Sequence, residues 1–318
     1  MGTHRVAPLV LSLPVLLAIG CAAGRSPASV AAVDRTKLPL GDSKYRGSAQ
    51  RGYVQSCQTS LAGPGGNGGA GGGGAGGDGP WIDATAKTWD ATRKIAVTGT
   101  VKRTATYSFG LSASARKLTG NGLPSVSGTF PVAADDPAYQ YDRNPNTIAG
   151  YTLSVSLSAR PKMAGTSTCV GGTIGVSSKG LPIYSAFDAE GRDASAHELQ
   201  DSCGGHPQNT GQYHFHALPA CFADSAAKTA HSKLAGYALD GFGIYGHKGV
   251  GGKVVTNASL DACHGHTHTI IWNGKRKRMF HYHATYEFPY LVGCYRGTPV
   301  TRATGLGIGS PPGGGPPQ

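Results

Sequence analysis

The chain has 318 residues, 39% of them hydrophobic, and a formal net charge of +12. This length allows one domain with a substantial core. The positive charge predicts association with anionic envelope polymers, whereas specific nucleic-acid binding is not expected, because Lys275–Arg278 is the only basic run and nothing indicates a recognition helix.

Residues 1–20 have the pattern of a secretory signal peptide. Their apolar run, Val6 to Ile19, is too short to span a membrane as a helix. Small residues precede Cys21, as in the bacterial lipobox, where the new N-terminal cysteine is acylated. We therefore expect an exported lipoprotein anchored in a membrane of the cell envelope through Cys21. The alternative is an ordinary cleaved signal and a secreted protein.

Two segments have compositions that are typical of unstructured chain. Residues 21–80 are expected to form a tether, because twelve of the seventeen residues from Gly63 to Gly79 are glycine. Residues 299–318 are expected to form a disordered tail rich in glycine and proline. The single folded domain is therefore predicted over residues 81–298.

The predicted domain is all-β or β-dominated. Apolar residues alternate with small or polar ones from Ile95 to Val101 and from Tyr151 to Ser158. Helical periodicity is weak and is confined to residues 223–235. Many glycines and serines between these runs indicate frequent turns.

A two-copy motif dominates the second half of the chain. Each copy has an aspartate, a cysteine and a glycine-histidine pair, then a His-x-His unit between aromatic residues, and finally a second cysteine. The first copy comprises Asp201, Cys203, His206, His214, His216 and Cys221, and the second comprises Asp261, Cys263, His264, His266, His281, His283 and Cys294. The upstream segment Gly180–Tyr184 likewise matches Gly241–Tyr245. We expect two similar halves related by a pseudo-twofold axis.

Six cysteines remain when Cys21 is set aside, and export predicts that they form three disulfides. The duplicated order predicts Cys203–Cys221 and Cys263–Cys294, and elimination leaves Cys57–Cys169. Oxidised cysteines are not thiolate ligands, so any metal site would use histidine and carboxylate groups.

Turn signals predict how the histidines pair. Asn273-Gly274 is typical of a two-residue hairpin turn, and its register places His266 opposite His281 and His264 opposite His283, with His268 on the same face. A bulge near Gly265 would spoil part of this arrangement.

In the first copy, a three-residue loop over 209–211, with Gly211 in the left-handed conformation, places His206 opposite His214. Imidazoles on one face of a hairpin are close enough to share an ion, since facing Cβ atoms lie ~4.5–5.5 Å apart.

We interpret these histidines as ligands of a transition metal, zinc or copper, since calcium and magnesium prefer oxygen. The candidate ligands are His206, His214, His216, His264, His266, His281 and His283. They would form one site or two, and an open coordination position would permit hydrolytic or redox chemistry. Whether the protein is an enzyme stays open. The alternative is that some histidines are merely hydrogen-bonded on a polar sheet face.

Three carboxylates lie near the repeated motifs. Asp201, Asp240 and Asp261 would either orient an imidazole or act as a general base. The alternative for all three is that they cap turns.

Taken together, the motifs resemble the YHYH domain family of exported proteins over roughly Trp81 to Gly297. The matching elements are Asn121–Pro124, Gly172–Tyr184, Asp201–His206, Tyr213–His216, Leu239–Gly246, Asp261–His266, Phe280–His283 and Phe288–Gly297. The chain reads Tyr-His-Phe-His and Phe-His-Tyr-His where the family name has tyrosine at both aromatic places. The imidazoles are therefore kept and one phenol is absent from each unit. The resemblance implies the domain and its motifs but no particular reaction.

A function of a different class is also consistent with the sequence. In that interpretation the protein is a non-catalytic module in which disulfides and core carry the fold, the histidines are structural, and exposed aromatic and basic residues bind a glycan or anionic polymer of the envelope.

Overall fold

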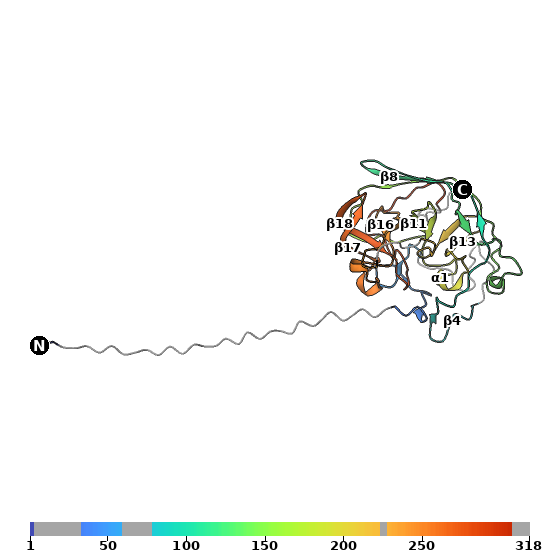
Figure 1. Cartoon of the computed structure of the whole chain (residues 1–318), viewed down its shortest axis with the longest axis horizontal. Helices are drawn as coiled ribbons and strands as arrows, with labels where there is room; N and C mark the ends of the chain where they lie inside the picture. Colours follow the sequence, from blue (N-terminus) through green and yellow to red (C-terminus); the bar gives the residue numbers. More distant parts are fainter. Residues whose placement is uncertain (3–32, 59–77, 223–227, 307–318) are drawn as a thin grey trace. The chain divides into compact units, whose positions relative to one another are not determined.

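The computed structural model describes residues 1–2, 33–58, 78–222 and 228–306 (Figure 1). The predicted signal peptide, Cys21, most of the glycine-rich segment and the chain from residue 307 lie outside the described residues. The chain divides into two units, residues 1–32 and 33–318, and the fold concerns the second. Within the described ranges, no helix has the length and apolar character needed to cross a membrane.

The fold is β-dominated, as predicted. The described α-helix is α1 (Ala194–His197), and short 3-10 helices cover Pro137–Gln140, Val250–Gly252 and Asn257–Ser259. The strands are β1 (Leu38–Pro39), β2 (Tyr45–Arg46), β3 (Val54–Gln55), β4 (Ile82–Asp83), β5 (Thr88–Trp89), β6 (Val101–Lys102), β7 (Tyr107–Leu111), β8 (Ala115–Gly120), β9 (Val126–Ser127), β10 (Leu153–Ser158), β11 (Thr173–Ser177), β12 (Pro182–Tyr184), β13 (Gly205–Pro207), β14 (Tyr213–Phe215), β15 (Leu234–Ala238), β16 (Gly243–Tyr245), β17 (Gly265–Trp272) and β18 (Lys275–His283).

An eight-stranded sheet contains both histidine motifs. Its order is β13-β14-β12-β11-β15-β16-β18-β17, so each hairpin lies at one edge (Figure 1). In each half the strand that ends in the matched tyrosine runs parallel to the second hairpin strand, with Ile183 opposite Phe215 and Ile244 opposite Tyr282. The halves meet at the antiparallel pair β11 and β15. The sheet therefore has the pseudo-twofold arrangement predicted from the duplication.

Of the two predicted alternations, that from Tyr151 to Ser158 forms a core strand, whereas that from Ile95 to Val101 forms no continuous strand and buries only Val97. In β10, Leu153, Val155 and Leu157 are buried while the intervening serines are partly or fully exposed. On the two hairpins, the aromatic residues that flank the histidines point into the core and are buried, namely Tyr213, Phe215, Phe280 and Tyr282. Because side chains alternate along a strand, this burial directs the histidines to the opposite face.

The N-terminal boundary differs from the expected one. Residues 33–58, which were expected to belong to a tether over 21–80, contribute β1, β2 and β3 to the fold. Leu38, Leu40 and Val54 are buried in the core, and β1 pairs with β5. Burying the apolar side chains of this segment stabilises its packing against the core, whereas the neighbouring glycines have no side chain to bury.

The C-terminal boundary also extends beyond residue 298. Thr304 pairs with Ser154, and Leu306 is buried.

All three predicted disulfides are present: Cys57–Cys169, Cys203–Cys221 and Cys263–Cys294. Two of them close the two histidine units, and the third attaches the N-terminal segment to the chain before β11. The disulfides and the core therefore stabilise this domain independently of any metal ion.

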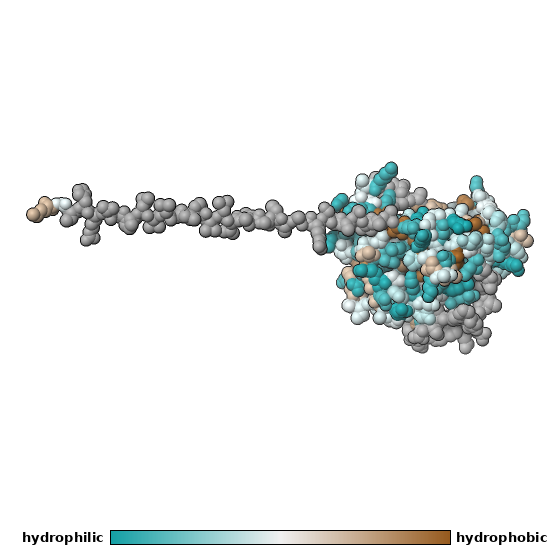
Figure 2. Space-filling view, turned by 90° about the horizontal axis from the view of Figure 1, so that it is seen from below, coloured by the Kyte–Doolittle hydropathy of each residue, from teal (hydrophilic) through white to brown (hydrophobic). Residues whose placement is uncertain are grey.

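The face shown in Figure 2 is coloured mainly as hydrophilic residues, with small hydrophobic patches.

Candidate metal centres

The first hairpin, β13–β14, has the predicted register. His206 is opposite His214, and Gly211 has a φ of 81° in the loop between the strands. His216 follows β14 on the same face as His214, because alternate residues of an extended segment point the same way. The turn and the alternation together bring three imidazoles from one hairpin to one place.

These three histidines form the first centre. Nitrogen atoms of His206, His214 and His216 all lie within 4.8 Å of one another. The Nε2 atoms of His214 and His216 are 3.1 Å apart, and all three side chains are buried. This compactness meets the geometric requirement for a shared ion.

Backbone carbonyls fix the orientation of two imidazoles. His214 Nδ1 lies 3.1 Å from the carbonyl oxygen of Gln212, and His216 Nδ1 lies 2.6 Å from that of Ser185. Each Nδ1 must donate its hydrogen there, so each neutral ring keeps a lone pair on Nε2. Metal-binding histidines are typically held in this way. Both nitrogens of His206 are buried without a hydrogen-bond partner among the described residues.

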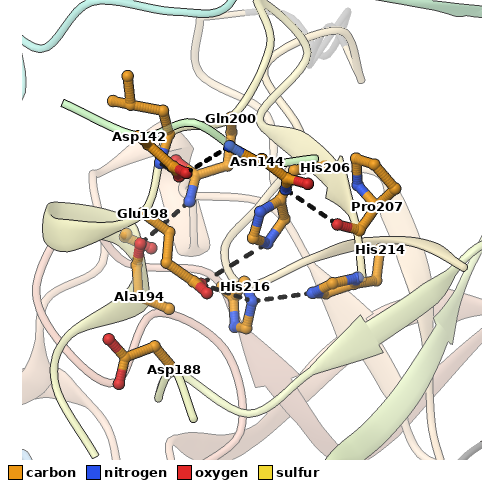
Figure 3. A network of polar contacts seen from close by, with 12 residues as sticks. Asp142, Asn144, Asp188, Ala194, Glu198, Gln200, His206, Pro207, His214 and His216 are labelled. Atoms are coloured by element: carbon orange, nitrogen blue, oxygen red, sulfur yellow. Dashed lines mark hydrogen bonds and ion pairs between the residues drawn. The ribbon is translucent and has the colours of Figure 1, made fainter. Parts of the chain in front are cut away.

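A carboxylate that the sequence analysis did not single out lies beside this centre. Glu198 Oε2 is 3.3 Å from His216 Nε2 and 3.6 Å from His206 Nε2 (Figure 3). Burial raises the pKa of Glu198 well above its usual value, and Asp188 and Asp142 raise it further. A nearby cation would favour its ionised form.

A cleft of about 390 Å³ opens at the first centre. Glu198 and all three imidazoles line it, together with Asp188 and Gln208 among others. Glu198 follows the helix α1 and precedes the aspartate of the motif by three residues, which is a position without any distinctive local signal.

The second hairpin, β17–β18, confirms the predicted turn. Asn273 and Gly274 have φ values of 50° and 76°, and His266 is opposite His281. The register ends at the pair Gly265 and Tyr282, so the expected ladder stops one pair short.

His264 is therefore not in the cluster, which corrects its assignment as a candidate ligand. Its backbone has a φ of 76°, and its Nε2 lies 3.0 Å from Thr285 Oγ1. The left-handed conformation turns the side chain away from the face that His266 occupies.

Five histidines form the second centre: His231, His266, His268, His281 and His283. Nitrogen atoms of all five lie within 4.8 Å of one another. The hairpin register predicts His268 on this face, but the candidate ligands named from the sequence include neither His268 nor His231. His231 lies just before β15 and contacts the hairpin, its Nε2 being 3.0 Å from His283 Nε2.

The second centre repeats the hydrogen bonds of the first. His281 Nδ1 faces the carbonyl of Met279 at 3.1 Å, as His214 faces Gln212. His283 Nδ1 faces the carbonyl of Gly246 at 2.7 Å, as His216 faces Ser185. In the described structure, Nε2 of His266, His268 and His281 is buried without a hydrogen-bond partner. The lone pairs of this centre therefore converge.

Burial favours the neutral form of imidazoles in both centres. It lowers the pKa of His216 to about 4, and together with neighbouring imidazoles it lowers the pKa of His266 to about 4 and that of His281 to about 2. The pKa values of His206, His214 and His283 are also well below the usual value, for the same two reasons. Neutral imidazoles with converging lone pairs are the form of histidine that binds metal ions.

The three aspartates have structural partners. Asp201 accepts hydrogen bonds from the backbone N–H groups of Cys203 and Gly128 and from the Tyr213 hydroxyl. Asp261 similarly accepts from the N–H groups of Cys263 and Gly265.

Asp240 accepts from the N–H of Gly297 and from the Tyr282 hydroxyl. These contacts support turn capping, and the described hydrogen bonds connect none of the three aspartates to an imidazole.

The residues present fit a transition-metal ion. Imidazole nitrogens suit zinc and copper, and two nitrogens bound to one tetrahedral ion at about 2.0–2.1 Å would lie ~3.3 Å apart. The closest Nε2 pairs, at 3.1 Å and 3.0 Å, are near that separation.

Comparison with known proteins supports the resemblance noted in the sequence. The family model described as YHYH protein matches residues 156–259. The matched region contains the first centre and His231 and ends before Asp261, so the second hairpin lies beyond it. No curated protein and no solved structure gives a significant match.

Proposed function

We propose that this chain, which carries the YHYH family pattern over residues 156–259, is an exported protein that binds a transition-metal ion at each of its two histidine centres. The supporting observation is the arrangement of imidazoles in both halves of the sheet. Carbonyls hold the Nδ1 hydrogens, and buried Nε2 atoms face one another. Two Nε2 lone pairs 3.0 Å apart repel unless a proton or a metal ion lies between them.

Zinc and copper are the metals of choice. Both bind imidazole well, and neither centre offers the set of oxygen ligands that calcium or magnesium requires. The cysteines are in disulfides, which leaves no thiolate in the described part of the chain to compete for the ion.

Hydrolytic chemistry is the activity that the first centre supports best. Three nitrogen ligands leave one position of a tetrahedral ion free, as in catalytic zinc sites. Glu198 lies beside His206 and His216, and the cleft would give a substrate access to an ion held by these imidazoles. Redox chemistry would require copper at the same ligands.

The cysteines and the N-terminal sequence support a location outside the cytoplasm. Three disulfides are typical of an oxidising compartment outside the cytoplasm. The lipobox-like sequence at Cys21 supports a membrane anchor, and the net charge of +12 supports contact with anionic envelope polymers. Replacing Cys21 with serine is expected to move the protein from the membrane fraction to the soluble fraction.

Elemental analysis of protein purified without a histidine tag tests metal binding. We expect about two zinc or copper ions per chain. The variant His214→Asn/His216→Asn should retain about one ion, and His281→Asn/His283→Asn should also retain about one. A correctly folded protein that binds neither metal would overturn the proposal. It would favour an envelope-binding module in which the histidines are structural.

A further inference from the structure

Three imidazoles of the first centre have counterparts in the second, and the two centres differ in the residues around these imidazoles. The duplication matches His206 with His266, and the hydrogen bonds match His214 with His281 and His216 with His283. His206 and His266 have the same register, and the other two pairs have backbone carbonyl partners at equivalent positions. The residues that surround the matched imidazoles have diverged.

One difference lies on the first hairpin strand. Two residues after the first matched histidine, the second centre has His268, whereas the first centre has Gln208. Gln208 lines the cleft, whereas His268 contributes a nitrogen to the cluster.

Another difference lies just before the central strands. Thr173 pairs with Tyr184 as Leu234 pairs with Tyr245, which aligns the two halves. At that alignment, His231 of the second centre corresponds to Val170 of the first. Val170 and the two glycines that follow it line the cleft.

Glu198 is the third difference. Counted back from the capping aspartate of each motif, its counterpart is Ala258. The first centre therefore has a carboxylate and a cleft, whereas the second centre has additional imidazoles.

We infer that the duplicated centres have diverged into an open one and a closed one. The metal at His206, His214 and His216 takes an external ligand from the cleft, next to Glu198. The five imidazoles of the second centre fill the coordination of its ion and exclude such a ligand. This inference rests on the proposed metal binding and assigns the reactive site to one half of the sheet.

The lining of the cleft indicates which ligands it accepts. Its carboxylates are Asp142, Asp188, Glu190 and Glu198, and Arg192 is its one guanidinium group. Arg192 is already paired with Asp188 at 2.8 Å and lies 3.3 Å from Glu190. This excess of carboxylates offsets the charge of a bound divalent ion and so disfavours anions. Amide side chains such as Asn144 and Gln208 offer hydrogen bonds. The expected ligand is an uncharged polar molecule with an oxygen donor.

Substitutions that exchange the residues around the matched imidazoles test the inference. Untagged protein is loaded with Co²⁺, whose visible absorption reports coordination, and titrated with acetohydroxamic acid, which is uncharged in solution at neutral pH and binds a metal ion through its oxygens as the hydroxamate after losing a proton. Wild type is expected to bind one equivalent per chain with two cobalt ions present. Gln208→His should weaken this binding at least tenfold. The double variant His231→Val/His268→Gln, which leaves His266, His281 and His283 at the second centre, should create a second equivalent.

Cobalt content and thermal unfolding are measured on the same samples. All three positions are only partly buried, so the substitutions should be tolerated. Should Gln208→His fail to fold, His231→Val/His268→Gln alone decides, because only a closed second centre gains a ligand position. A folded protein that binds no cobalt defeats the metal proposal itself. Two bound cobalt ions, with hydroxamate at both centres or at neither in the wild type, overturn the inference alone.

Discussion

The Nε2 atoms of His231 and His283 lie 3.0 Å apart, although Nδ1 of each ring faces a backbone carbonyl, at 2.8 Å and 2.7 Å respectively. Each Nδ1 therefore carries the hydrogen, and two lone pairs face each other across a short distance. His214 and His216 repeat this relationship in the other half of the sheet, at 3.1 Å. A bound cation converts both repulsive contacts into attractive ones.

Metal removal is accordingly expected to lower the stability of the fold. An ion that binds only the folded state, and whose free concentration is 100 times its dissociation constant, adds about 2.7 kcal/mol to the free energy of unfolding. Two such ions would contribute about twice this amount. Urea unfolding with and without a strong chelator measures the difference. Identical midpoints in the two conditions would show that the centres are empty or irrelevant to stability.

His283 and His264 form a matched pair for mutagenesis. Both are buried, but only His283 belongs to the five-histidine cluster, whereas His264 contacts Thr285. His283→Gln is expected to weaken the binding of one of the two ions, as measured by competition with a chelator. His264→Gln should keep both ions and lower stability by about 1–3 kcal/mol through the lost buried hydrogen bond. Equal metal loss in both variants would place His264 at the site after all.

The metal-free protein should lose stability as the pH falls below 6.5. Burial depresses the pKa of His216 and His266 to about 4 and that of His281 to about 2. Between these values and 6.5, the unfolded chain therefore binds protons at these histidines that the folded chain does not bind. The contribution of these residues is complete above their unfolded pKa and is lost as the pH falls through the folded values. Each histidine adds a slope of up to about 1.4 kcal/mol per pH unit.

Urea titrations between pH 4.5 and 7.5 measure this slope. His216→Gln should reduce the slope by up to about 1.4 kcal/mol per pH unit, which is the contribution of one histidine. A slope that does not change in this variant would mean that His216 titrates normally in the folded chain.

Asp201 is expected to matter for folding and not for metal binding. It accepts the N–H groups of Cys203 and Gly128 and the Tyr213 hydroxyl. Asp201→Asn replaces one acceptor oxygen with a donor group, which should cost about 2–4 kcal/mol, because hydrogen bonds to charged groups are the strong ones. Metal content at saturating zinc should stay at two ions. Loss of an ion with unchanged stability would instead identify Asp201 as a residue that positions an imidazole.

The hairpins could be predicted because their determinants are local. Asn273-Gly274 and Gly211 fix the turns, and alternation then fixes which side chains share a face. His264 departs from the pattern because one left-handed residue ends the ladder, and only the possibility of a bulge was visible in the sequence.

His231 and Glu198 could not be predicted in the same way. Each is a single residue outside the His-x-His units, and only the pairing of β15 with β16, or the position of α1, brings it to its centre. The N-terminal boundary was missed for a similar reason. A glycine-rich stretch separates residues 33–58 from the rest of the domain, and tertiary contacts decide where that segment lies.

Anomalous diffraction from crystals of the metal-loaded protein tests the central claim most directly. At the absorption edge of the bound metal we expect two peaks per chain. One should lie about 2.0–2.1 Å from Nε2 of His214 and His216, and the other at a similar distance from Nε2 of His231 and His283. Peaks at other residues, or an absence of peaks in protein that was supplied with zinc or copper, would contradict the account.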